Sequence, residues 1–120
     1  MQSKTVLIAE DQGIISLDLK LFLKANNINS IIVQNSQDLL EQHELIKPYL
    51  IIADLNIGGK IDGKEALTEV NKTYNTPIII ISGSSKSRVE KFTSTLKGCT
   101  YLLKPFDKSE LLKLIQKIPD

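Results

Sequence analysis

Residues 6–11 read Val6-Leu7-Ile8-Ala9-Glu10-Asp11, so that four apolar residues in succession lead into two acids. An unbroken apolar run of this length is typical of a strand that is buried on both faces of a parallel sheet. Four further runs of the same kind follow along the chain: Ile31-Ile32-Val33, Leu50-Ile51-Ile52-Ala53, Ile78-Ile79-Ile80-Ile81 and Tyr101-Leu102-Leu103. The sequence therefore predicts five buried strands.

Amphipathic segments separate these runs. In the first of them Ile15, Leu19 and Phe22 recur at helical spacing, and similar stripes precede the fourth and fifth runs and follow the fifth. The segment from Ser36 to Ile46 has a weaker helical pattern, for which Ser36 is the expected N-cap. Strands that alternate with helices in this way predict an α/β fold. We expect a doubly wound, flavodoxin-like, five-stranded parallel sheet in the order 2-1-3-4-5, with five helices.

Length and composition place limits on the function. The chain has 120 residues, which suits one core, so we expect a single domain over residues 1–120. It carries 15 Lys and Arg against 14 Asp and Glu, a net charge of +1 that gives no electrostatic basis for binding nucleic acid or a membrane surface. No apolar run approaches the ~20 residues of a membrane span, and the amino-terminal residues lack the layout of a signal peptide. With a single cysteine in addition, we expect a cytoplasmic protein.

Chemically reactive side chains stand at the ends of the predicted strands. Glu10 and Asp11 follow the first strand, Asp54 the third and Lys104 the fifth, while Ser82 ends the fourth. Ligands of doubly wound sheets bind beyond the carboxyl ends of the strands, at the switch point between strands one and three. We therefore expect these five side chains to share one small cleft.

The three acids in this cleft predict a metal ion. Carboxylates that are close together repel each other and remain ionised only when a cation joins them. Oxygen ligands without histidine or cysteine favour Mg²⁺ over zinc. A Mg²⁺ ion and the Lys104 ammonium facing one carboxylate form an anion site that stabilises the charge of a phosphoryl group in transfer. Asp54 ends a central strand on which the other groups can converge, so it is the predicted nucleophile.

Taken in order, these residues resemble the receiver domains of response regulators, the phosphoacceptor modules of two-component systems. The resemblance covers almost the whole chain and rests on these positions: Glu10, Asp11, Asp54, Ser82, Tyr101, Lys104 and Pro105. It implies that Asp54 is the phosphoacceptor and that Asp11 and Asp54 bind Mg²⁺ through their carboxylates. It also implies that Glu10 acts through a metal-bound water and that Asn56 supplies its backbone carbonyl.

The resemblance further implies which residues respond to phosphorylation. Lys104 would contact the phosphoryl oxygens, and its peptide bond to Pro105 is often cis in this family. Ser82 would hydrogen-bond the phosphoryl oxygens in the active state, and Tyr101 would be the aromatic residue that moves with it. The fourth helix, the fifth strand and the last helix would form the output face, although the basic residues of segment 86–97 are equally typical of a solvated helix face.

The function implied by the family is a phosphorylation-dependent signalling switch. Such a protein is not an enzyme, apart from the assistance that it gives to its own phosphoryl transfer and hydrolysis. The expected donor is a sensor histidine kinase or a phosphotransfer protein. The expected output is a downstream protein, a covalently attached output domain or a phosphorylation-dependent dimer. Neither nucleic acid nor a membrane is an expected direct partner.

Three other functions fit parts of the pattern. A phosphatase of the haloacid dehalogenase type also forms an aspartyl phosphate, but it needs a second acid where Asn56 stands and a cap domain for which 120 residues leave no room. A flavin carrier of the same topology needs a phosphate-binding loop after the first strand, where Glu10 and Asp11 would repel the phosphate. A pseudo-receiver that only binds partners has no motif that distinguishes it, so this alternative stays open.

Some positions depart from the family pattern or stand outside it. The family commonly has a proline four residues after the phosphoacceptor, where Gly58-Gly59 begin a segment that is one residue longer than usual. We therefore expect a more flexible loop at this point. His43, the only histidine, is expected on the solvated surface of the weakest helix. Cys99 is expected to be a small packing residue.

Overall fold

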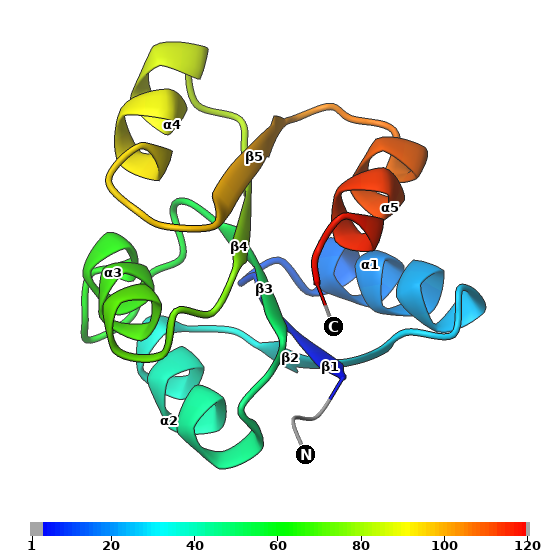
Figure 1. Cartoon of the computed structure of the whole chain (residues 1–120), viewed down its shortest axis with the longest axis horizontal. Coiled ribbons are helices and arrows are strands. Elements are labelled where there is room, and N and C mark those ends of the chain that lie inside the picture. Colours follow the sequence, from blue (N-terminus) through cyan, green and yellow to red (C-terminus); the bar gives the residue numbers. More distant parts are fainter. Residues whose placement is uncertain (1–3, 120) are drawn as a thin grey trace.

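Strands and helices alternate along residues 4–119, the part of the chain that the computed structural model describes (Figure 1). The strands are β1 (Thr5–Ala9), β2 (Asn29–Val33), β3 (Leu50–Asp54), β4 (Ile78–Ser82) and β5 (Cys99–Leu103). The helices are α1 (Gly13–Ala25), α2 (Ser36–Ile46), α3 (Gly63–Tyr74), α4 (Lys86–Thr93) and α5 (Lys108–Gln116). All strand pairs are parallel and the order is β2-β1-β3-β4-β5, which confirms the predicted doubly wound fold.

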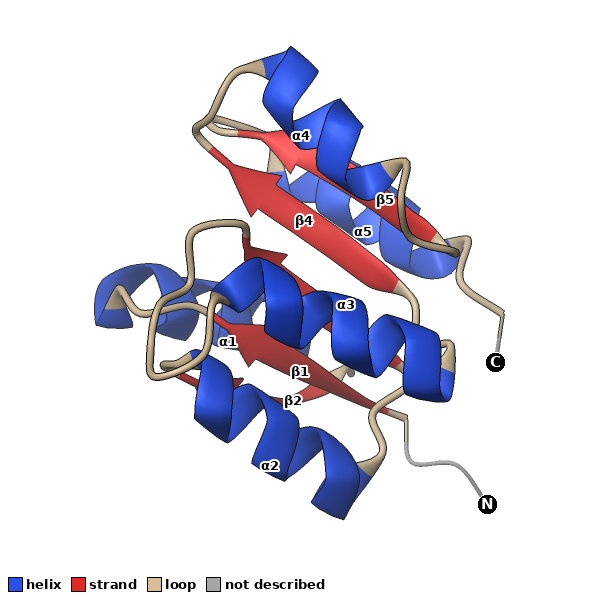
Figure 2. Cartoon of the chain, turned by 90° about the vertical axis from the view of Figure 1, so that its left-hand side faces the viewer, coloured by secondary structure: helices blue, strands red, loops and turns tan. Residues whose placement is uncertain are grey.

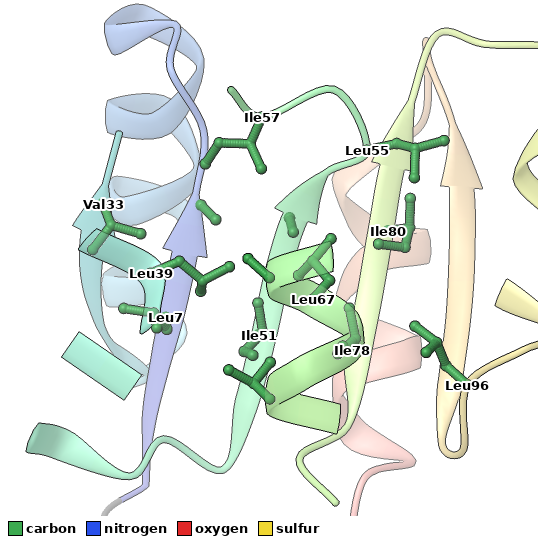
Figure 3. Packing of buried hydrophobic residues seen from close by; sticks show 14 of the residues in the cluster. Leu7, Val33, Leu39, Ile51, Leu55, Ile57, Leu67, Ile78, Ile80 and Leu96 are labelled. Carbon is green, nitrogen blue, oxygen red and sulfur yellow. The ribbon is translucent and has the colours of Figure 1, made fainter. Parts of the chain in front are cut away.

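Helices cover both faces of the sheet. Figure 2 shows α2, α3 and α4 on the near face, with α1 and α5 behind the sheet. Successive residues of a strand point to opposite faces, so Leu7 of β1 belongs to the core layer under α2 and α3 and Ile8 to the layer under α1 and α5. Figure 3 shows the first layer, in which Leu39 of α2 and Leu67 of α3 lie over the sheet. Because the central strands are buried on both faces, they need continuous apolar sequences.

Helix α4 is the shortest of the five, with eight residues. It contributes one buried apolar side chain, Val89, to the first core layer, and Phe92 is partly buried against the same layer. The remaining positions of its first two turns, among them Arg88 and Lys91, are exposed. None of the helices between residues 4 and 119 is long and apolar enough to cross a bilayer.

Helix α2 spans the predicted residues Ser36–Ile46, but its N-cap residue differs from the prediction. The N-cap is Asn35, which has an extended backbone and whose side chain accepts a hydrogen bond from the Asp38 N–H at 2.8 Å. Ser36 is the first helical residue, and its hydroxyl donates instead to the carbonyl of Ile61. The prediction of Ser36 as N-cap is therefore wrong. Both residues are good N-cap types, and the choice between them depends on a loop that approaches from elsewhere in the chain.

His43 is buried, and the expectation of a solvated histidine is wrong. It lies on the face of α2 that also buries Ser36 and Leu39, and its side chain is 1% exposed. Its Nε2 atom is 2.8 Å from the hydroxyl oxygen of Thr76, and its ring centroid is 4.6 Å from that of Tyr74. Its Nδ1 atom has no hydrogen-bond partner among the described residues. Burial lowers the pKa of His43, because it disfavours the charged imidazolium.

This burial predicts a pH-dependent free energy of unfolding. The unfolded chain binds a proton at His43 with the ordinary histidine pKa of 6.5, whereas the folded protein resists protonation because its pKa is lower. The contribution of neutral His43 to the free energy of unfolding is therefore fully present above pH 6.5. It falls as the pH drops from 6.5 towards the folded pKa, by at most ~1.4 kcal/mol per pH unit. Urea unfolding at pH 7.5 and 5.5 measures the loss. His43→Gln should show a clearly smaller loss, and an equal loss in both proteins would contradict the prediction.

Candidate functional site

The register of the sheet brings the predicted site residues to one edge. Ala9 of β1 pairs with Ala53 of β3, Asp54 pairs with Ile81, and Ser82 pairs with Leu103 of β5. The strand arrowheads in Figure 2 accordingly lie on the same side of the molecule. The residues that end or follow β1, β3, β4 and β5 therefore meet there, as the switch-point argument predicts.

The three acids form a compact group. One carboxylate oxygen each from Glu10, Asp11 and Asp54 lie within 4.8 Å of one another. The Glu10 side chain is buried, that of Asp54 is 12% exposed and Asp11 is exposed. Burial raises the pKa of Glu10, and the neighbouring Asp54 and Asp11 raise it further, whereas the Gln12 N–H and Lys104 lower it. A divalent cation in this group would relieve the repulsion.

Lys104 points its ammonium into the acid group. Its Nζ atom is 3.3 Å from Asp54 Oδ2 and 3.8 Å from Glu10 Oε2, and its side chain is 28% exposed. The backbone N–H of Lys104 donates to the Ser82 carbonyl at 2.8 Å, which extends the β4–β5 pairing to the site. The Lys104-Pro105 peptide bond is cis, as the family resemblance implied.

Asp54 is held in one orientation by hydrogen bonds to both of its carboxylate oxygens. Oδ2 faces Lys104, and Oδ1 accepts the backbone N–H of Asn56 at 2.9 Å. The backbone turns back at this point, because the Ile57 N–H donates to the Asp54 carbonyl at 3.1 Å. Asn56 thus lies two residues after Asp54 in a tight turn, where its backbone is near the acid group.

Ser82 and Tyr101 occupy the positions that the resemblance assigned to the switch. Ser82 is fully buried, and its hydroxyl oxygen accepts the Ser84 N–H at 3.0 Å. Tyr101 pairs with Ile80 in the sheet. It is partly buried against the first core layer, the one that α2 and α3 cover and to which Val89 of α4 also belongs. Partial burial and the nearby Glu90 carboxylate of α4 raise the pKa of the Tyr101 hydroxyl.

The segment between β3 and α3, residues 55–62 (the acceptor loop), is more restrained than expected. The Ser36 N–H donates to the Gly58 carbonyl at 2.8 Å, and the Lys60 N–H donates to Gln37 Oε1 at 3.0 Å. Sequence reasoning did not single out Gln37, and it assigned Ser36 to a different contact. The Gly58-Gly59 pair was the one signal in the sequence that a close backbone approach occurs here.

A comparison with protein families identifies the group to which this chain belongs. The family described as "Response regulator receiver domain" matches residues 6–116. The chain belongs to the response regulator receiver family. Receiver domains generally bind Mg²⁺ at an acidic cluster, and Glu10, Asp11 and Asp54 form such a cluster here. The oxygen-only donor set, with one buried acid and no histidine or cysteine, suits that ion.

Curated proteins and solved structures agree with this assignment. The receiver domain is 30% identical over 114 residues to the transcriptional regulatory protein PdtaR of Mycobacterium tuberculosis, covering 94% of this chain and 55% of that protein. It is 33% identical over 113 residues to the response regulator ArlR of Staphylococcus aureus, covering 94% and 51%. The fold matches the chemotaxis protein CheY4 of Vibrio cholerae with a TM-score of 0.85 at 20% identity, covering 99% and 100%. The chain thus spans about half the length of these two curated relatives.

Proposed function

We propose that this receiver domain accepts a phosphoryl group on Asp54 in a Mg²⁺-dependent reaction and thereby switches a signalling output. The observation that carries the proposal is the 3.3 Å contact of Lys104 Nζ with Asp54 Oδ2 inside a group of three carboxylates. A nucleophile, a fixed cation and a set of oxygen ligands are the parts that phosphoryl transfer requires.

In the proposed reaction an Asp54 carboxylate oxygen attacks the phosphorus atom of the donor. The new O–P bond forms as the P–N bond of a phosphohistidine, or the P–O bond of a small acyl phosphate, breaks on the opposite side. The Asn56 N–H keeps the carboxylate oriented. Lys104 leaves Asp54 Oδ2 for the phosphoryl oxygens and balances their charge. Mg²⁺, held by Asp11 and Asp54, with Glu10 acting through water and the Asn56 carbonyl completing the set, would supply further electrostatic stabilisation.

In this reaction the domain acts as a phosphoacceptor and not as a turnover enzyme. The aspartyl phosphate is the signalling state, and its hydrolysis by water at the same site resets the switch. Asn56 is exposed and carries an amide where a phosphatase would need a general acid. Position 56 therefore offers no group that could protonate the leaving group of such a phosphatase.

The partner that delivers the phosphoryl group is expected to dock on α1. Three apolar residues of this helix are exposed: Ile14 is 88%, Leu17 53% and Leu21 58% exposed. A surface hollow of about 440 Å³ lies between the start of α1 and Pro105-Phe106, and Lys104 forms part of its lining. We propose that a sensor histidine kinase or phosphotransfer protein binds here, because this apolar surface adjoins the phosphoacceptor site. A downstream protein or attached output domain would read the face of α4, β5 and α5.

Acetyl phosphate tests the function without the natural donor. In the presence of Mg²⁺ the intact protein should gain the mass of one phosphoryl group, and addition of EDTA should prevent the gain because the cation is required. Intact-protein mass spectrometry measures both states. A protein that gains no mass with acetyl phosphate, a small phosphoramidate or a phosphorylated donor domain would instead be a pseudo-receiver.

A further inference from the structure

The first turn of α2 holds the acceptor loop in place through three hydrogen bonds. The Ser36 N–H donates to the Gly58 carbonyl at 2.8 Å, and the Ser36 hydroxyl donates to the Ile61 carbonyl. The Lys60 N–H donates to Gln37 Oε1 at 3.0 Å. The first N–H groups of a helix have no partner within the helix, so the loop carbonyl satisfies a donor that α2 leaves open. Two consecutive helical residues thus fix three successive parts of the loop.

The contact with Gln37 depends on the absence of a side chain at Gly59. Gly59 has a φ of +143°, which other residues rarely adopt, and a Cβ atom there would lie 2.3 Å from Gln37 Oε1 and 2.6 Å from Ser36 Oγ. A Cβ atom on Gly58 would meet no atom within 4 Å. The second glycine of the pair, and not the first, is therefore required for the loop to approach α2.

The other end of the acceptor loop is fixed to the phosphoacceptor. The Asn56 N–H donates to Asp54 Oδ1 at 2.9 Å, and the Ile57 N–H donates to the Asp54 carbonyl at 3.1 Å. Ile57 is 2% exposed and belongs to the core layer shown in Figure 3. Gly63 lies close to its backbone, because a Cβ atom on Gly63 would be 2.2 Å from the Ile57 carbonyl oxygen. The loop backbone around Asn56 is consequently held by hydrogen bonds to Asp54 on one side and by the Lys60–Gln37 hydrogen bond on the other.

We propose that Gln37 is a positioning residue for the metal site, acting through the acceptor loop on the backbone of Asn56. The proposal rests on the Mg²⁺-dependent function proposed above, in which the Asn56 carbonyl completes the ligand set. By accepting the Lys60 N–H, Gln37 limits the conformations that the acceptor loop can adopt before Mg²⁺ binds. Mg²⁺ binding then costs less conformational entropy of the acceptor loop, so the affinity for the ion is higher than for a loop without this restraint.

A pair of glutamine substitutions in α2 isolates this effect. Gln37→Met keeps the length of the side chain but removes the acceptor, and Gln42→Met makes the same exchange later in the helix, away from the loop. NMR titration with Mg²⁺ alone, following the Asn56 and Lys60 amides, gives the dissociation constant. We expect Gln37→Met to bind Mg²⁺ about 3- to 10-fold more weakly, the loss that corresponds to one net hydrogen bond. Gln42→Met should bind like the wild type.

Three further variants make the test independent of any one substitution. Gln37→Glu retains an acceptor for the Lys60 N–H and should restore at least wild-type affinity, which a purely structural role would not explain. Gly59→Ala should displace the Gln37 side chain and weaken Mg²⁺ binding, whereas Gly58→Ala should not. Equal affinities in the wild type and Gln37→Met, or an equal loss in Gln42→Met, would overturn the positioning role alone. Failure of the wild type to bind Mg²⁺ would overturn both this role and the proposed function.

Discussion

Replacing Asp54 by asparagine is expected to abolish phosphoryl addition while leaving the domain folded. An amide oxygen is too weak a nucleophile to attack phosphorus, and it also gives Mg²⁺ a neutral ligand in place of a charged one. The exchange preserves the shape of the side chain and an oxygen that can accept the Asn56 N–H, so the turn after β3 should persist. Intact-protein mass spectrometry after treatment with acetyl phosphate and Mg²⁺ should show the unmodified mass only.

Asp62, the acid at the end of the acceptor loop, provides the matched control. Asp62 caps α3 by accepting the Lys64 N–H at 2.8 Å, and asparagine is an equally good N-cap residue. Asp62→Asn should therefore accept a phosphoryl group as the wild type does. If Asp54→Asn gained the same mass as Asp62→Asn, another residue would be the acceptor and the assignment of Asp54 would be wrong.

Ser82→Ala is expected to separate phosphorylation from the structural response. The Ser82 hydroxyl is buried at the end of β4 and accepts the Ser84 N–H in the resting state. In the proposed active state it donates to a phosphoryl oxygen instead, which draws the β4–α4 loop towards Asp54 and lets Tyr101 move. Without the hydroxyl, Asp54 still accepts the phosphoryl group, but the active arrangement loses its distinguishing contact. The variant should lose about 1 kcal/mol of stability from the missing hydrogen bond.

Beryllofluoride provides a stable mimic of the phosphoryl group for this experiment. In the wild type, the mimic should shift the backbone NMR signals of Arg88, Lys91 and Leu103, which lie on α4 and β5. In Ser82→Ala most of these changes should disappear while those near Asp54 remain. Ser85→Ala, which alters an exposed serine in the same loop, should behave like the wild type. A full wild-type shift pattern in Ser82→Ala would show that the hydroxyl is not the trigger.

The parts of the structure that could be predicted are those that follow from burial and chain order. The run Ile78–Ile81 lacks polar residues because β4 is covered on both faces, and this property is visible without knowledge of the neighbours. Once five such runs alternate with helices, the order of the strands has few solutions. The positions of Asp54 and Lys104 follow, because residues at the ends of parallel strands meet at one edge.

The parts that could not be predicted depend on contacts between segments distant in sequence. His43 is polar, so it interrupts the apolar stripe of α2, and only the approach of Thr76 and Tyr74 gives it a buried position. Gln37 looks like any surface residue of a helix until the acceptor loop is placed beside it. Local sequence contains neither contact, because in both cases the partner belongs to another element.

Helix α4 packs on the sheet through few buried side chains, which would set the sensitivity of the proposed switch. Its one buried apolar side chain, Val89, contributes about 1.5–3 kcal/mol to holding the helix against the sheet. This is comparable to the few kcal/mol that separate the two arrangements of a protein that responds to a ligand. In the proposed switch, a phosphoryl group would therefore have to outweigh the packing of Val89 and the partly buried Phe92, and not that of an entire core. In that switch, the volume of the residue at position 89 would set the phosphorylation level at which the domain responds and the fraction of molecules that are active without phosphorylation.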